Sequence, residues 1–129
     1  MNFDVSEQQA KIIKVAREFG EKEIAPKADE YNQEGRFPLE IYRNLGRAGL
    51  LGITIPTEWG GAGMNHVTLM KVVEELGYHC LVLSAVVGMN SCLTGLQLLH
   101  QPAFDHYAFR PRMVEHIAEF LVPPEQVES

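Results

Sequence analysis

From Leu81 to Leu99 the chain carries no charged side chain, and this run limits the possible folds more than any other feature. Its length satisfies the minimum for a membrane-spanning helix. Five polar side chains and two glycines interrupt it, however, and no basic residues stand at its ends as membrane anchors. We therefore predict no membrane span, but a helix buried on all sides in the core of a water-soluble protein.

A first amphipathic helix is predicted near the N-terminus. Ser6 and Gln9 have the spacing of a capping box, in which each side chain caps the other residue's backbone amide, so the helix should start at Glu7. Pro26 lacks an N–H group and should interrupt the helix, and Gly35 should end the helical segment that follows. The apolar positions predicted to face inward are Ile12, Val15, Ala16 and Phe19.

A second helix should follow Pro38, which suits a first helical turn, and should stop at Gly49, a natural left-handed residue. Its apolar side is predicted to consist of Ile41, Tyr42, Leu45 and Ala48. The apolar run Leu50–Ile55 is too short for a helix and lies before Pro56. We predict an extended connector there.

A third helix should begin at Asn65, whose side chain can cap it, and should end at Gly77. Its predicted inward positions are Val67, Met70, Val73 and Leu76. These elements predict an all-α fold, a small helical bundle. Three short helices barely cover a fourth that is apolar all round, so a further covering surface is expected.

Residues 101–129 differ in character from the preceding residues, which we predict to form one domain, 1–100. Pro102 and Pro111 break this tail, and Met113–Leu121 is predicted to form at most one short helix. The apolar positions on one face of that helix are Met113, Ile117 and Phe120. The rest of the tail is expected to be irregular.

Chain length, net charge and cysteine content limit the classes of function that the chain can have. A chain of 129 residues is long enough for one core, and the net charge of −6 argues against nucleic-acid binding, which requires clustered Lys and Arg. Cys80 and Cys92 lack metal-ligand spacing and are interpreted as reduced core residues. The first residues lack a basic segment and an apolar segment typical of a secretion signal. We expect a cytoplasmic protein.

No self-contained active site is evident from the residues. The Gly60–Gly63 loop fits a tight turn better than a phosphate cradle, because it lacks the known phosphate-binding patterns. Glu74 and Glu75 point about 100° apart on a helix and cannot form a facing acid–base pair, so a solvated or helix-bridging role is expected. The five histidines show no metal-ligand pairing, and Ser84 and Ser91 lack a nucleophile elbow.

Four blocks in order carry a resemblance to a known family: Lys22–Ala28, the block of the second helix that ends with Gly49–Pro56, Glu58–Gly63 and Val73–Gly77. From about Phe3 to His100 the chain resembles the N-terminal helical domain of FAD-dependent acyl-CoA dehydrogenases. In that family a glutamate removes the α proton of an acyl-CoA thioester while a hydride leaves Cβ for FAD. An electron-transfer flavoprotein often reoxidises the cofactor. Trp59 is a mild departure, since other bulky residues are commoner there, and we expect it to pack against a helix.

The resemblance implies that the end of the buried helix forms one wall of the acyl-tail pocket. By position this wall corresponds to Val86, Met89, Asn90, Leu93 and Thr94. These are the substrate-binding candidates, and plain core residues are the competing interpretation. Neither a catalytic residue, nor a cofactor-binding residue, nor a metal ligand is predicted.

Past His100 the resemblance stops, and no counterpart of the flavin-contacting domain or of the catalytic base is found. The chain alone is therefore expected neither to hold FAD tightly nor to dehydrogenate acyl-CoA. One hypothesis is a truncated acyl-CoA dehydrogenase that requires flavin-binding domains. A second is a helical interaction module that dimerises or binds another chain through its exposed helix. A third, weaker one is acyl binding without chemistry.

Overall fold

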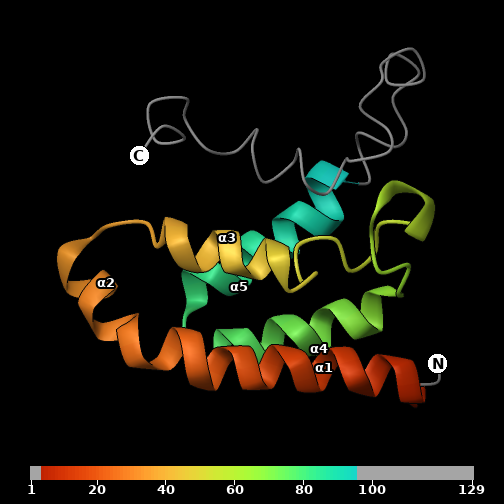
Figure 1. Cartoon of the computed structure of the whole chain (residues 1–129), viewed down its shortest axis with the longest axis horizontal. Helices are drawn as coiled ribbons and strands as arrows, with labels where there is room; N and C mark the ends of the chain where they lie inside the picture. Colours follow the sequence, from red (N-terminus) through yellow and green to blue (C-terminus); the bar gives the residue numbers. More distant parts are fainter. Residues whose placement is uncertain (1–3, 96–129) are drawn as a thin grey trace, which may run out of the picture.

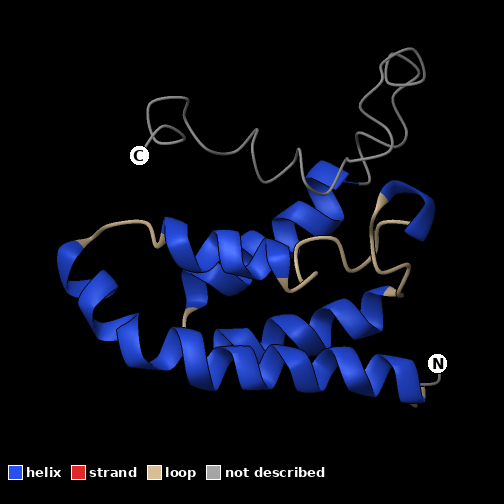
Figure 2. Ribbon diagram, in the orientation of Figure 1, coloured by secondary structure: helices blue, strands red, loops and turns tan. Residues whose placement is uncertain are grey.

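The computed structural model describes residues 4–95, with only the backbone described for 93–95, and every regular element in this range is helical (Figures 1 and 2). The α-helices are α1 (Glu7–Phe19), α2 (Ala28–Glu34), α3 (Leu39–Arg47), α4 (His66–Gly77) and α5 (Leu81–Met89). Two π-helical turns, η1 (Gly20–Ile24) and η4 (Asn90–Gly95), and two 3₁₀ turns, η2 (Ala25–Lys27) and η3 (Thr57–Trp59), complete the set. The predicted all-α fold is confirmed.

Helix α1 starts where its capping box predicts. The Gln9 backbone N–H donates to the Ser6 hydroxyl at 3.3 Å, and the Ser6 N–H donates to the Gln9 side chain at 2.8 Å. The helix then changes type twice, into η1 at Gly20 and into η2 around Pro26, before α2 ends at Gly35 with φ +60°. The predicted interruption at Pro26 is confirmed, although the irregular geometry begins several residues earlier.

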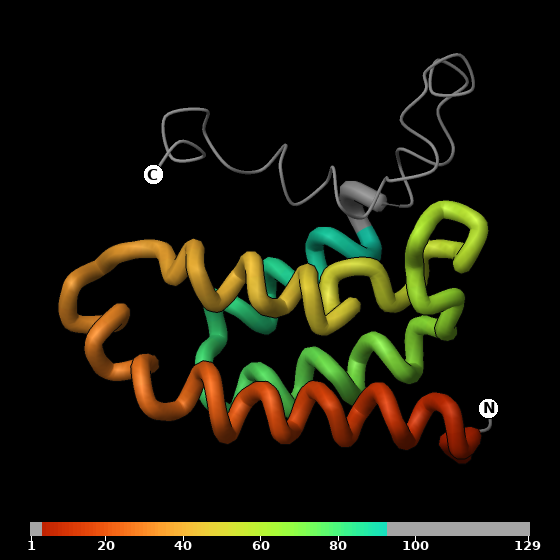
Figure 3. The backbone as a smooth tube through the Cα atoms, viewed as in Figure 1, coloured from red at the N-terminus to blue at the C-terminus, as the bar shows by residue number. Residues whose placement is uncertain are grey.

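The helices form two layers (Figure 3). Helices α1 and α4 pack along each other in one layer, α3 and α5 lie in the other, and α4 also packs along α5. Between the layers lies an apolar core to which α1, α3, α4 and α5 all contribute. Its buried residues include Ala16, Tyr42, Leu45, Leu69, Val72, Leu76, Leu83 and Val87. The α3–α4 connection adds Leu50, Leu51, Ile53 and Ile55, all fully buried. This run is a series of turns, so the predicted extended connector is wrong. It begins after Gly49, whose φ of +77° ends α3 as predicted.

The predicted inward face of α4 is partly wrong. Met70 is 53 % exposed, whereas Thr68, Leu69, Val72 and Leu76 are buried. Helix α4 contacts both α1 and α5, so its buried face is wider than one stripe and is rotated from the predicted one. Thr68 is buried without penalty because its hydroxyl donates to the capping Asn65 side chain at 2.9 Å. Val15 and Ala48 are likewise exposed rather than inward.

The uncharged helix is not buried on all sides within the described part of the chain. Leu83, Ser84 and Val87 face the core, but Leu81 is 77 % exposed, Val82 50 % and Met89 55 %. Residues 96–99 and the predicted helix Met113–Leu121 lie outside the described residues. Between residues 4 and 95 no helix has the length and hydropathy needed to cross a membrane.

Candidate functional site

Three of the five predicted pocket residues can be placed with their side chains. Met89 is half-exposed at the end of α5, and Val86 is half-buried one turn earlier. Asn90, the first residue of η4, is 1 % exposed. Leu93 and Thr94 lie on the backbone of η4, and their side chains are outside the described residues. The junction of α5 and η4 therefore presents Met89 outward and Asn90 inward.

Asn90 fixes this junction to α3. Its amide donates to the Tyr42 hydroxyl at 3.0 Å, and both side chains are buried. Burial raises the pKa of the Tyr42 hydroxyl, since the phenolate would be poorly solvated, and the hydrogen bond from Asn90 lowers it by a smaller amount. A neutral, buried tyrosine thus holds the start of η4 in place.

Ser91 anchors η4 to the turns of the α3–α4 connection. The backbone N–H of Ile53 donates to the Ser91 hydroxyl at 3.3 Å, and this hydroxyl donates to the Leu51 carbonyl at the same distance. The Thr54 hydroxyl donates to the Ser91 carbonyl at 2.9 Å. From the sequence, Ser91 was weighed only as a nucleophile, so this anchoring role was missed. Its partners are 37 to 40 residues distant, so no local pattern reveals them.

One face of α5 is apolar and uncovered among the described residues. Leu81, Ala85 and Met89 recur every four residues, and Val82 and Val86 lie beside them, which places the five on one side of the helix. We call this set the α5 stripe. Contiguous apolar surface of this kind is typical of an interface or of a ligand-binding wall.

The glycine-rich loop does not form a phosphate cradle. The backbone N–H groups of Gly61, Ala62, Gly63 and Met64 donate to carbonyls of the preceding connection, at distances between 2.8 and 3.2 Å. Gly60 and Gly63 adopt φ values of +85° and +64°, which other residues rarely adopt. The predicted tight turn is confirmed, and these amides are not available to an anion.

Glu75 bridges two helices, as expected for one of the two adjacent glutamates. The Arg17 guanidinium of α1 donates to both Glu75 oxygens, at 2.6 and 3.1 Å. This hydrogen bonding lowers the pKa of the Glu75 carboxyl. Between residues 4 and 95, no cluster of three or more potential ligands could hold a metal ion. Cys80 and Cys92 are free, half-buried thiols packed against the core.

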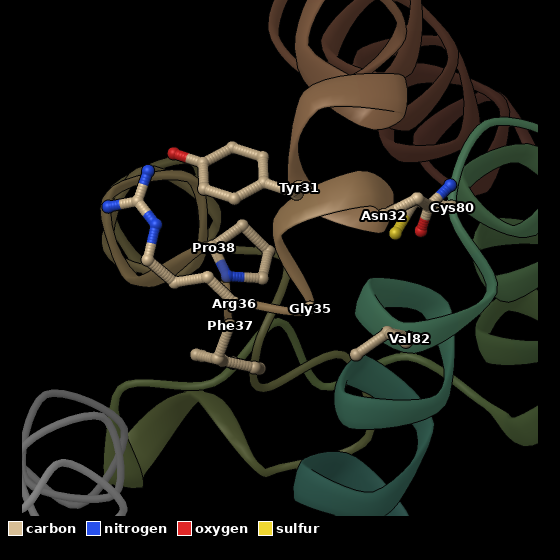
Figure 4. Close-up of a pocket in the computed structure, with 8 residues that line it drawn as sticks. All are labelled: Tyr31, Asn32, Gly35, Arg36, Phe37, Pro38, Cys80 and Val82. Carbon is tan, nitrogen blue, oxygen red and sulfur yellow. The ribbon is translucent and has the colours of Figure 1, made fainter.

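A pocket of about 310 Å³ opens beside the start of α5 and was not foreseen from the sequence. Its lining comes from α2, the α2–α3 connection and the residues around the α5 N-terminus: Tyr31, Asn32, Gly35, Arg36, Phe37, Pro38, Cys80 and Val82 (Figure 4). The Arg36 guanidinium lies 5.1 Å from the Tyr31 ring centre and pairs with Glu34 at 3.0 Å. Through Val82 the pocket is continuous with the α5 stripe.

Comparison with known proteins shows which family shares this sequence and its helical fold. The family model "Acyl-CoA dehydrogenase, N-terminal domain" matches residues 6–102. "Probable acyl-CoA dehydrogenase YngJ" of Bacillus subtilis is 38 % identical over 80 residues, which are 62 % of this chain and 21 % of that protein. "Acryloyl-CoA reductase (NADH)" of Anaerotignum propionicum is 33 % identical over 90 residues, 70 % of this chain and 23 % of that protein.

A solved structure has a similar fold. A chain in the structure of the electron transferring flavoprotein of Acidaminococcus fermentans matches with a TM-score of 0.73 and 27 % identity, covering 86 % of this chain and 30 % of that one. The chain thus spans between about a fifth and a third of the length of these relatives. It belongs to the acyl-CoA dehydrogenase family and carries that family's N-terminal domain.

Proposed function

We propose that this chain supplies the helical wall of an acyl-CoA-binding site in a longer, FAD-dependent enzyme of the acyl-CoA dehydrogenase type. The names of these two relatives describe reactions in opposite directions, a dehydrogenation and a reduction, and both names include a CoA thioester. The wall consists of Val86, Met89, Asn90, Leu93 and Thr94. The observation that carries the proposal is the half-exposed Met89 on a helix end that buried hydrogen bonds connect to α3 and to the α3–α4 connection.

Oxidation and reduction are the work of other parts of such an enzyme. The glycine-loop amides that could bind a dinucleotide phosphate are all used within the chain, so FAD does not fit there. The chain by itself neither binds FAD tightly nor oxidises acyl-CoA. Its two free, half-buried thiols fit a cytoplasmic protein.

The flavin part of the proposal is tested by adding FAD to the purified chain and separating bound from free flavin by gel filtration. The Bacillus subtilis relative, treated in the same way, is the positive control. We expect no flavin to elute with the chain and no acyl-CoA-dependent reduction of a dye. Either signal would contradict this part of the proposal.

The wall itself is tested in a chimera, in which residues 6–102 replace the matching segment of the Bacillus subtilis relative. Met89→Asp places a charge against the acyl tail and is expected to lower kcat/KM for acyl-CoA by about 10- to 100-fold. Met70→Asp, at an equally exposed position on α4, is the matched control and should leave kcat/KM unchanged. Equal effects of both substitutions would argue against a wall at Met89.

The α5 stripe also favours a second candidate function, that of an interaction module which dimerises or binds another chain. Exposed Leu81 and Val82 are the supporting observation. Sedimentation velocity of the purified chain tests self-association, and a species that remains monomeric at high concentration excludes it. The flavin test does not distinguish these two functions, whereas the chimera does.

A further inference from the structure

Helix α5 does not continue beyond Met89 as an α-helix. The backbone passes instead into η4, the π-helical turn Asn90–Gly95, which carries the wall candidates Leu93 and Thr94. A π turn takes in one residue more than an α turn, because its hydrogen bonds join residues five apart. Residues from this turn onward are therefore displaced around the helix axis by about one residue, roughly 100°. Whatever holds the π geometry also sets the place of the wall.

The Thr54 hydroxyl occupies a carbonyl that an α-helix would use. In an α-helix the Ser91 carbonyl would accept from the N–H of Gly95, four residues further on. Here this carbonyl accepts from the Thr54 hydroxyl at 2.9 Å. A side chain that enters the helical hydrogen-bond ladder is a known cause of irregular helix geometry. Thr54 and Ser91 are both buried, so the bond is shielded from water.

Three further buried hydrogen bonds hold the first two residues of η4. The Ser91 hydroxyl accepts from the Ile53 N–H and donates to the Leu51 carbonyl, both at 3.3 Å. The Asn90 amide donates to the Tyr42 hydroxyl at 3.0 Å. These three bonds engage side chains of η4, whereas the bond from the threonine engages its main chain. The threonine bond is therefore the one of the four that acts directly on the helix type.

We propose that Thr54 is a positioning residue, which keeps the end of α5 in the π geometry and thereby sets the acyl chain length that the wall prefers. This inference rests on the proposed function. Without the hydroxyl, the Ser91 carbonyl is left to an α-helical bond, which moves the backbone of Leu93 and Thr94 around the helix axis. A displaced wall meets different methylene groups of an acyl tail, and one methylene in an apolar pocket changes kcat/KM by about tenfold or more.

The first test needs no activity and uses the full chain. Cys92 lies in η4 and Cys80 directly before α5, and both are free, half-buried thiols. Alkylation by iodoacetamide, followed by mass spectrometry of the peptides, gives the rate of Cys92 relative to Cys80. Thr54→Val keeps the branched shape and Thr54→Ala does not, but both lose the hydroxyl and should raise this relative rate at least about fivefold. Thr54→Ser keeps the donor and should leave the relative rate unchanged.

Thr68→Val is the matched control for this test. Thr68 is also buried, and its hydroxyl also donates over 2.9 Å, but it lies at the start of α4 and its acceptor is Asn65. Its loss should not change the relative rate of Cys92. Circular dichroism shows which variants keep the helical fold. A folded Thr54→Val or Thr54→Ala variant with an unchanged relative rate would overturn the proposal, as would an equal rise in Thr54→Ser or Thr68→Val.

The second test measures chain-length preference in the chimera that carries residues 6–102. The quantity is the ratio of kcat/KM for an eight-carbon acyl-CoA to that for a four-carbon one. A smaller folded fraction lowers both values equally, so the ratio responds to the site and not to stability. Thr54→Val should change this ratio at least about tenfold, whereas Thr54→Ser and Thr68→Val should leave it within about twofold.

The proposed wall and the role of Thr54 fail in different ways. If Met89→Asp lowers kcat/KM but Thr54→Val leaves the chain-length ratio unchanged, the wall stands and the role of Thr54 in chain-length preference is wrong. If Met89→Asp has no effect in the chimera, the wall is wrong and the chain-length role is lost with it. The alkylation of Cys92 in the full chain then still decides whether Thr54 holds η4.

Discussion

The two most apolar segments of the described chain behave in opposite ways. Leu50–Ile55 has no regular helix, yet its apolar side chains are fully buried and its neighbouring amides are hydrogen-bonded. Helix α5 is regular and apolar all round, yet one side of it is uncovered by the described residues. Burial is therefore set by which segments surround a run, and composition alone does not determine it. An apolar helix with one face left open marks a place where something else belongs.

The largest test of this difference compares two leucines, one from each segment. Leu51→Ala removes a fully buried side chain and is expected to lower the free energy of unfolding by about 2–5 kcal/mol. Leu81→Ala truncates a side chain that is 77 % exposed and should cost less than about 1 kcal/mol. Urea titration followed by circular dichroism measures both. Similar losses would mean that α5 is covered as completely as the connection.

A second test concerns the close packing around the connection. A Cβ on Gly61 would collide with the backbone carbonyl of Ile55, which cannot rotate away, so Gly61→Ala should cost about 1–3 kcal/mol. The added Cβ of Gly60→Ala meets open space, so the only expected loss of stability comes from the strained φ of +85° and is about 1 kcal/mol. Urea titration of both variants gives the comparison. A Gly61→Ala variant as stable as the wild type would show that the connection is loosely held.

The buried hydrogen bond at the start of η4 gives a smaller effect. Tyr42→Phe leaves the Asn90 amide buried without its acceptor and should cost about 1–2 kcal/mol. Tyr78→Phe is the matched control, because this tyrosine is 88 % exposed, and it should be neutral. The two free energies of unfolding are measured by the same titration. If Tyr42→Phe is also neutral, water reaches the α5–η4 junction.

The smallest expected effect is that of the α1–α4 ion pair. The folded-state pKa of Glu75 is lowered, so the pair's stabilisation is complete above the unfolded-state pKa of about 4.3 and is lost as pH falls through the folded-state value. Glu75→Gln should lower the midpoint of thermal unfolding by less than about 5 °C at pH 7. The difference from wild type should shrink below about pH 4. A difference that grows in acid would contradict this assignment.

Sequence signals were sufficient where structure is determined locally. The caps at Ser6 and Asn65 and the stop at Gly49 were predicted correctly, since each depends on a few neighbouring residues. Met70 was misplaced because the inward face of α4 depends on two packing partners at once. The role of Ser91 was missed for the same reason, because its partners lie far away in the sequence.

The family resemblance and the order of the helices were thus readable from the sequence, while the open side of α5 was not. Periodicity cannot assign a face to a helix that is apolar all round, so Leu81–Met89 was predicted to be buried throughout. The pocket beside α5 likewise depends on bringing Phe37 and Val82 together across the fold. Of the predicted wall, Met89 is open and Asn90 is a buried anchor, a division visible only in the structure.

The most direct test of the proposed wall is methionine oxidation of the chimera, with and without acyl-CoA. Met89 on the α5 stripe and Met70 on α4 are equally exposed in the described fold, at 55 % and 53 %, so each serves as the other's control. After brief treatment with peroxide at low protein concentration, mass spectrometry of the peptides gives both rates. If Met89 lines the acyl site, bound acyl-CoA will slow the oxidation of Met89 several-fold and leave that of Met70 unchanged. Equal effects of acyl-CoA on the two methionines would contradict the proposed wall.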